Sequence, residues 1–464
     1  MTAPPTPQQL VEHALATSTC DEAVAIVRHG HHANLRWANN TLTTNGAMHD
    51  VGVTVVAFDH RPDGIAAGSV SGSATTLEQV DSLVVAADAA ARAGSPAEDA
   101  AELVPGEAAA DWDEPPAETS IGVYADVAPG LGEAFGSAEA GGRLLYGFVD
   151  HAMVTTYLGS TTGLRRRHVQ PTGHYACTGK DAALTQSAWV GGATRDFTDV
   201  DAAGLDARLA RRLAWGERQV DLPAGRYDTV LPPGSVSDLM IYAYWSAGAR
   251  VAHEGQSVFS RRGGGTRIGE QVASPGVDLW SDPAHPGLEC QPFVEASASG
   301  NTESVFDNGL PLARTHWITD GRLTALQQTR HSAALTGQPV TPGIDNLVLD
   351  VASGAGDEMD LVAGMDHGLL VTCLWYIREV DPQTLLLTGL TRDGVYLVEG
   401  GEITGEVNNF RFNESPVDLL TRFSHASSTA PSFSREWGDE FFSRTATPAL
   451  RIPDFNCSSV SLAR

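Results

Sequence analysis

Residues 238–275 of the chain read DLMIYAYWSAGARVAHEGQSVFSRRGGGTRIGEQVASP. The stretch opens with a helix-like segment, which the proline pair at 232–233 precedes. A polar bend, the pair Arg261–Arg262 and a run of three glycines follow. Pro223 and the pair Pro232–Pro233 lie between residues 220 and 240, and we expect a boundary between two domains there.

The length and the order of patterns predict a two-domain α+β protein. A chain of 464 residues exceeds the roughly 250–300 residues that one core usually supports. Residues 1–220 mix helical and strand patterns, so we expect an N-terminal α/β domain of mixed strands and helices. Strand patterns predominate after residue 270, so residues 221–464 are predicted to form a mostly antiparallel, β-rich domain with a closed, barrel-like sheet.

Local signals place individual elements. Apolar residues at helical spacing predict helices at 7–18, 75–93, 125–141 and 201–219. Strand patterns include two strands on either side of Gly30 and a Val-rich strand at 51–58. Residues 94–121 are interpreted as an irregular surface crossing. The expected hairpin signals are Asp320–Gly321, Asp393–Gly394 and Gly400–Gly401.

Charge and cysteine content limit the expected partners and compartment. The chain has 57 acidic and 30 basic residues, a net charge of −27. Nucleic acids and anionic membranes are bound through basic surfaces, so we expect neither as a partner. Five widely spaced cysteines do not indicate a disulfide framework. The N-terminus lacks a signal-peptide pattern and no apolar run reaches about 20 residues, so the sequence predicts a cytoplasmic protein.

Three segments in a fixed order carry a family resemblance. They are GEQVASP at 269–275, FDNGLPLARTHWITDGRL at 306–323 and GVYLVEGGEITGEVNNF at 394–410. With them, and with its N-terminal order of elements, the chain resembles the TldD/PmbA (TldD/TldE) family, whose members work as peptidase complexes. The resemblance implies a heterodimer with a zinc-bearing TldD-like chain and an enclosed cavity that admits unfolded peptides.

The zinc-binding positions of that family hold other residues here. The resemblance places a His-Glu-x-x-x-His motif where this chain has Met240, Ile241 and Trp245. Zinc takes imidazole, thiolate or carboxylate ligands, whereas a thioether suits copper(I) and an indole offers no lone pair. The family's third ligand, a Cys, has no counterpart at 432–435. We expect a PmbA/TldE-like subunit without catalytic residues, metal or cofactor, with zinc held by the partner.

Other motifs are incomplete, and the remaining candidates are peptide contacts. His253–Glu254 opens like a metallopeptidase motif, but the second His is replaced by Ser257. The glycine run after Arg261–Arg262 lacks the Gly-Lys-Ser/Thr of a phosphate loop, although guanidiniums can bind a peptide carboxylate. Aromatic and amide side chains on strands suit capture of a peptide as an added strand. The predicted peptide-binding residues are His253, Glu254, Arg261, Arg262, Trp375, Tyr376, Asn408, Asn409 and Arg411.

Three functions remain open at this point. The first is the non-metal-binding subunit of a TldD/TldE-type metallopeptidase complex, a hydrolase of unfolded peptides only together with its partner. The second is a zinc-free enzyme reused for amide or acyl chemistry in specialised metabolism, with Cys373, His253 or Glu254 as reactive groups. The third is a peptide-binding scaffold without catalysis.

Overall fold

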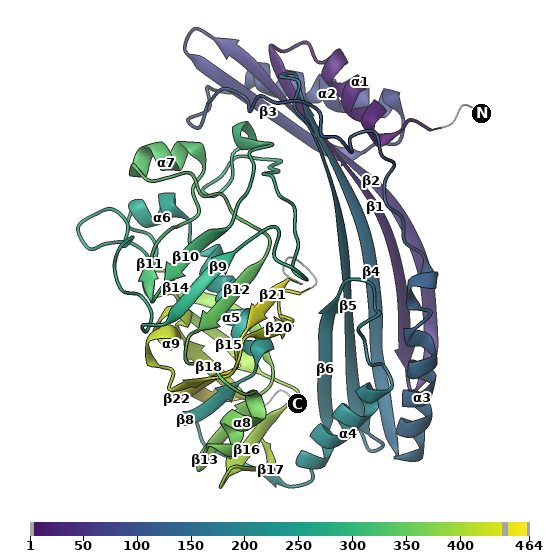
Figure 1. Ribbon diagram of the computed structural model, residues 1–464, viewed down its shortest axis with the longest axis vertical. Coiled ribbons are helices and arrows are strands. Elements are labelled where there is room, and N and C mark those ends of the chain that lie inside the picture. Colours follow the sequence, from purple (N-terminus) through teal and green to yellow (C-terminus); the bar gives the residue numbers. More distant parts are fainter. Residues whose placement is uncertain (1–3, 439–443, 462–464) are drawn as a thin grey trace.

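The N-terminal part of the chain is built on a six-stranded antiparallel sheet, which forms a tall curved wall in Figure 1. The structure is a computed structural model that describes residues 4–438 and 444–461. In sheet order the strands are β3 (Gly64–Ser73), β2 (Thr41–Arg61), β1 (Glu22–Ala38), β4 (Arg143–Ser160), β5 (Arg165–Asp181) and β6 (Ser187–Thr194).

The α-helices described in residues 4–220 all cover the same face of this sheet. One pair, α1 (Pro7–Thr17) and α2 (Leu77–Ala93), packs at one end, and α3 (Val127–Ala140) and α4 (Gly204–Trp215) pack at the other. Side chains alternate between faces along a strand, so the odd-numbered residues of β1 share the helix-covered face. Val27 packs in the apolar cluster under α1 and α2, and Leu35 packs in the apolar cluster under α3 and α4. The middle of β1 therefore lies between the two clusters. Capping boxes at Thr6 and Thr76 begin α1 and α2.

Two further sheets make up the C-terminal part. In sheet order, the first contains β11 (Arg322–Leu323), β10 (Thr315–Thr319), β9 (Val277–Ser281), β12 (Leu347–Val351), β21 (Thr445–Thr447) and β20 (Ala430–Ser432). The second contains β14 (Leu374–Asp381), β15 (Leu386–Thr391), β18 (Phe410–Glu414), β22 (Leu450–Val460), β8 (Gly225–Leu231), β13 (His367–Val371), β16 (Val395–Glu399), β17 (Glu402–Val407) and β7 (Gln219–Val220), with β19 (His425–Ala426) on β22.

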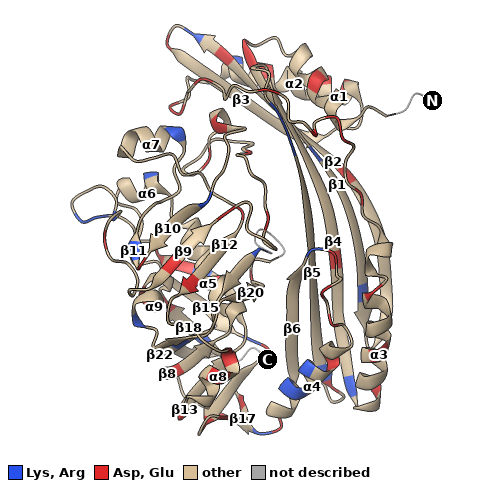
Figure 2. Ribbon diagram, in the orientation of Figure 1, with Lys and Arg blue, Asp and Glu red and all other residues tan. Residues whose placement is uncertain are grey.

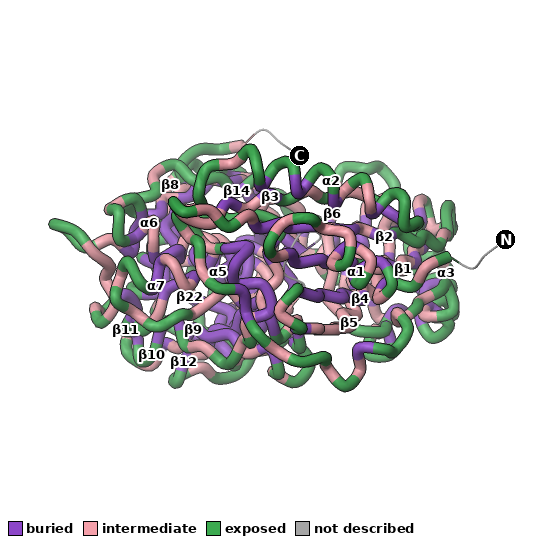
Figure 3. The backbone as a smooth tube through the Cα atoms, turned by 90° about the horizontal axis from the view of Figure 1, so that it is seen from above, coloured by how far each residue is buried: buried purple, intermediate pink, exposed green. Residues whose placement is uncertain are grey.

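Helix α5 (Pro233–Trp245) lies in the core that these two sheets share. It contacts β20 and β21 of one sheet, β8 of the other, and helix α9 (Pro416–Arg422). Apolar residues surround α5 on most sides, as expected for a core helix, and it is buried in the view of Figure 3. The shorter helices are α6 (Ala249–His253), α7 (Arg330–Thr336), α8 (Glu358–Ala363), and the 3-10 turns η1 (Ile121–Tyr124) and η2 (Val305–Asp307).

The C-terminal part packs on the sheet face opposite the helices. Phe58 of β2 contacts Phe306 of η2 with ring centroids 4.9 Å apart, inside a cluster that also contains Val24 and Leu158. Asp and Glu are spread over both parts of the molecule (Figure 2), in keeping with the net charge of −27. Among the described helices, none combines the length and the apolar character that crossing a membrane requires.

The α+β fold class is confirmed, but the prediction of a closed, barrel-like sheet is wrong. In the part of the chain that the structure describes, β14 pairs only with β15 and β7 only with β17, so both edges of that sheet are open. The apolar faces of both sheets are buried against each other and against α5. Two packed layers therefore bury the core without closure of either sheet.

Two local predictions are also wrong. Gly30 lies inside β1, and the chain reverses at Asn39 and Asn40, whose φ angles of 51° and 58° asparagine tolerates. Asp393–Gly394 connects β15 to β16, but these strands are not neighbours in the sheet, so no hairpin forms there. The hairpins at Asp320–Gly321 and Gly400–Gly401 are confirmed.

Candidate functional site

Helix α5 carries the residues that stand at the expected zinc positions. Met240 and Ile241 are 1% and 0% exposed and belong to the main C-terminal core. Trp245, near the end of the helix, packs edge-on against Trp437 with ring centroids 5.0 Å apart, and Tyr242 lies 5.8 Å from the same ring. Apolar and aromatic groups therefore fill this end of α5, and Met240, Ile241 and Trp245 supply no zinc ligand.

Asp238 is a fully buried carboxyl group two residues before Met240. Its Oδ1 accepts hydrogen bonds from the Ser434 hydroxyl and, at 3.0 Å, from the backbone N–H of Glu436. The indole N–H of Trp437 donates to the Asp238 carbonyl at 2.9 Å. Burial raises the pKa of Asp238 to about 8. These contacts tie α5 to residues 434–437, which overlap the segment 432–435 where the resemblance would place the third zinc ligand.

Arg435 is the centre of an adjoining, partly buried cluster. Its guanidinium donates to Cys373 Sγ at 2.6 Å and to the Asp393 carboxylate at 2.7 Å. It also lies over the rings of Trp189 and Trp375, at 4.8 and 4.9 Å from their centroids. Burial raises the pKa of Cys373 to about 12 in spite of the nearby arginine. The thiol therefore stays protonated at neutral pH, which makes it unsuited to act as a nucleophile.

In the part of the chain that the structure describes, three cavities that lie between the N-terminal sheet and the C-terminal part stand out. The first, of about 520 Å³, is lined by Arg28 of β1 and by Trp245 at the end of α5. The second, of about 580 Å³, lies against β5 and β6 and includes Arg444. The third, of about 830 Å³, includes Asn408 and Asn409. Spaces of several hundred Å³ with mixed polar and apolar walls are typical of ligand sites.

The first cavity is acidic. Arg28 Nε lies 2.6 Å from Glu295 Oε1, and this ion pair joins β1 to the C-terminal part. Asp345 is accessible to water within the cavity but is enclosed by protein, which raises its pKa; burial also raises the pKa of Glu303. Carboxyl groups whose pKa values are raised by burial inside a cavity mark it as a candidate functional site. Sequence reasoning missed these residues because they are far apart in the chain and share no motif.

The predicted peptide-binding residues do not form one site. Asn408 and Asn409 line the third cavity, where Asn408 Oδ1 accepts a hydrogen bond from the Leu222 N–H at 2.7 Å. Trp375 contacts Arg435, which lines the same cavity. The others are exposed and line none of the three cavities: His253, Glu254, Arg261, Arg262, Tyr376 and Arg411. Glu254 and Arg261 form surface ion pairs with Arg250 and Glu270. Peptide binding stays a prediction for all nine residues.

The sequence of the C-terminal part matches a known family. Residues 224–459 match the family described as the PmbA/TldA metallopeptidase C-terminal domain. The chain belongs to the TldD/PmbA family. Among curated proteins, no sequence matches this chain. The family assignment agrees with the resemblance carried by the three ordered segments, and it makes the fold one of metallopeptidase type.

Solved structures share the fold over nearly the whole chain. TldE from Thermococcus kodakarensis has 16% identity, covers 96% of this chain and 98% of its own, and superposes with a TM-score of 0.72. A protein described as a modulator of DNA gyrase from Thermotoga maritima has 17% identity, coverages of 94% and 95% and a TM-score of 0.73. A similarly described protein from Bacteroides thetaiotaomicron has 15% identity, 98% coverage of both chains and a TM-score of 0.74. At these identities the likeness establishes the fold alone.

Proposed function

We propose that this TldD/PmbA-family chain is the TldE-like subunit, without zinc at the family's catalytic position, of a heteromeric metallopeptidase that acts on unfolded peptides. A TldD-like partner chain supplies the zinc. The observation that carries the proposal is the composition of α5, where Met240, Ile241 and Trp245 offer a thioether, an alkane and an indole. Since none of these groups holds zinc or activates a zinc-bound water, hydrolysis needs a second chain.

The segment at 432–435 supports the same proposal. Ser432 and Ser434 are buried there, and their hydroxyls hydrogen-bond to Ser237 Oγ at 2.7 Å and to the Asp238 carboxylate. Arg435 forms the ion pair with Asp393. These polar groups are already bonded to protein partners, and none of them is a thiolate. These contacts support the proposal that residues in both expected parts of the zinc site stabilise the fold instead of binding a metal.

This subunit's contribution is a cavity wall with a strand edge. β6 is at the end of the N-terminal sheet, and in the described residues it pairs only with β5. Residues 191–194 of β6 line the second cavity. An extended peptide can add to such an edge through backbone hydrogen bonds, while side-chain pockets select its sequence. The carboxylates of the first cavity would favour cationic groups of the peptide.

The test is co-expression with a family member that carries the His-Glu-x-x-x-His motif. The two chains are expected to purify together and to cleave unfolded peptides only as a complex, with activity lost on chelation and restored by zinc. Ala193→Trp, which fills the second cavity beside β6, should raise KM or lower kcat in the complex. Ala89→Trp, on the exposed side of α2, is the matched control and should leave both unchanged.

Two outcomes would contradict the proposal. Peptide cleavage by this chain alone, in the presence of chelator, would make it an enzyme in its own right. A complex that binds peptide but never cleaves it would make the chain a scaffold. A zinc-free enzyme that uses Cys373 as its nucleophile is not supported, because this thiol is buried and protonated.

A further inference from the structure

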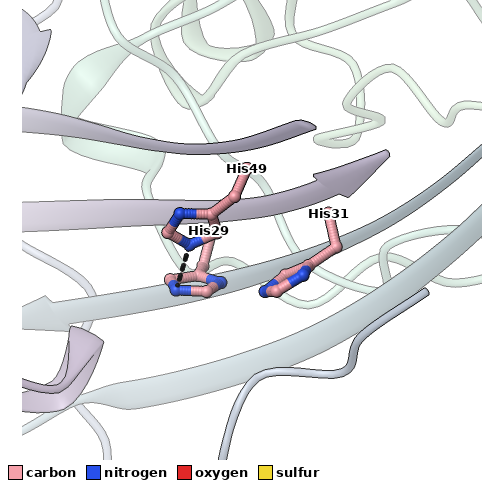
Figure 4. Close-up of side chains that lie close together, drawn as sticks. All are labelled: His29, His31 and His49. Atoms are coloured by element: carbon pink, nitrogen blue, oxygen red, sulfur yellow. Dashed lines mark hydrogen bonds between the residues drawn. The ribbon is translucent and has the colours of Figure 1, made fainter. Parts of the chain in front are cut away.

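Three histidines lie together on β1 and β2, on the helix-covered face of the N-terminal sheet (Figure 4). His31 and His49 are direct cross-strand partners, and His29 lies two residues from His31 on the same face. Ring centroids are 4.5 Å apart for His29–His49, 4.7 Å for His31–His49 and 5.1 Å for His29–His31. One nitrogen atom can be chosen from each ring such that the three atoms all lie within 4.8 Å of one another.

The cluster contains nitrogen atoms that the protein does not satisfy. His29 Nδ1 and His31 Nε2 are shielded from solvent and have no hydrogen-bond partner in the part of the chain that the structure describes. A hydrogen bond of 2.9 Å joins His29 Nε2 to His49 Nε2. Buried polar atoms without partners are rare in folded proteins and call for an explanation. Burial and the two neighbouring imidazoles also lower the pKa of His29 to about 4, so this ring is neutral near pH 7.

We propose that His29, His31 and His49 bind one divalent transition-metal ion of the zinc, nickel or copper type. Neutral imidazole is a ligand that these ions share, whereas magnesium and calcium take oxygen ligands. With metal–nitrogen bonds of about 2.0–2.1 Å in tetrahedral geometry, the ligand nitrogens lie about 3.3–3.4 Å apart. That spacing falls between the 2.9 Å contact and the 4.8 Å span of the cluster, so small side-chain rotations suffice.

The site would hold an exposed strand in place. β3 pairs with residues 52–61 of β2, so residues 41–51 have only β1 as a strand partner in the described sheet, and most of them are exposed. An ion shared by His49 of β2 and two histidines of β1 would cross-link this free edge to the sheet. The cluster lies between the two helix clusters, on the face away from the three cavities, and is therefore separate from α5.

The test uses the untagged chain, freed of metal and titrated by calorimetry with Zn²⁺ and with Ni²⁺. We expect one ion per wild-type chain, no binding of Mg²⁺, and a loss of affinity of at least about tenfold in His29→Gln and His49→Gln, the range seen even for weaker disturbances of metal sites. His253→Gln removes an exposed histidine on α6 and should keep wild-type affinity. Because His49 is exposed, its variant is expected to fold even if the His29 variant does not.

A second measurement separates the site from adventitious binding. Zn²⁺ should slow amide hydrogen exchange in residues 41–51 of the wild type and leave exchange in His49→Gln unchanged. Failure of the wild type to take up one equivalent, or equal affinities in the wild type and both Gln variants, would overturn the site. The experiment needs neither partner nor peptide, so its failure would leave the proposed peptidase function unaffected.

Discussion

The buried carboxyl group of Asp238 is expected to make the protein less stable as the pH rises. In the folded chain its pKa is raised from 3.8 to about 8, chiefly because burial penalises the charged form. Between these two values the folded state keeps a proton that the unfolded state has released. The free energy of unfolding therefore falls as the pH rises from about 4 to about 8, and it is constant with respect to this group outside that window.

The size of the effect follows from the pKa shift. Each pH unit inside the window changes the free energy of unfolding by about 1.4 kcal/mol, so about 4 kcal/mol is lost between pH 4 and pH 7. Asp238→Asn removes the titration and keeps a side-chain oxygen for the hydrogen bonds from Ser434 and Glu436. Relative to the wild type, this variant should gain about 1.4 kcal/mol of stability per pH unit between pH 5 and pH 8.

The assay is urea unfolding of both proteins at four pH values across that window, followed by tryptophan fluorescence. Taking the difference between the two proteins cancels the titration of the remaining carboxyl groups. Asp454→Asn, at an exposed aspartate of β22, is the control. A difference that does not change with pH would refute the reasoning, because Asp238 would then be ionised in the folded protein, with Ser434 and Arg435 stabilising its charge.

Single contacts predict three further outcomes. Arg435→Met removes the closer of the two arginines that pair with the half-buried Asp393 and leaves Arg392 at 3.8 Å, so urea unfolding should show a loss of about 1–3 kcal/mol; unchanged stability would mean that water or Arg392 replaces the guanidinium. Gly68→Ala places a Cβ 2.2 Å from a backbone nitrogen of α2, so the melting temperature should fall, whereas Gly52→Ala, with no atom within 4 Å of the added carbon, should have little effect on it. Cys373 is buried and protonated, so it should react with a thiol reagent only after unfolding, and rapid labelling of the folded chain would contradict this.

Helices and turns that depend on residues close together in the sequence were predictable. The helices at 7–18 and 75–93 correspond to α1 and α2, because threonine caps and apolar spacing act within a few residues. The hairpins at Asp320–Gly321 and Gly400–Gly401 formed as expected for the same reason. The failure at Asp393–Gly394 has a non-local cause: the strands on either side pair with other strands, and the Asp393 carboxylate binds Arg435 and Ser187 instead.

The sequence alone established which chemical groups stand at the expected zinc positions, and it carried the family resemblance, since residue identities and short motifs need no folding to be read. Tertiary structure decided which distant groups meet. It brought Arg28 to Glu295 and Asp345 in one cavity, and strand register placed His49 beside His29 and His31. Such contacts depend on pairing between strands and on domain packing, where a shift of one residue would turn each side chain to the other face of the sheet. Local patterns do not encode that choice.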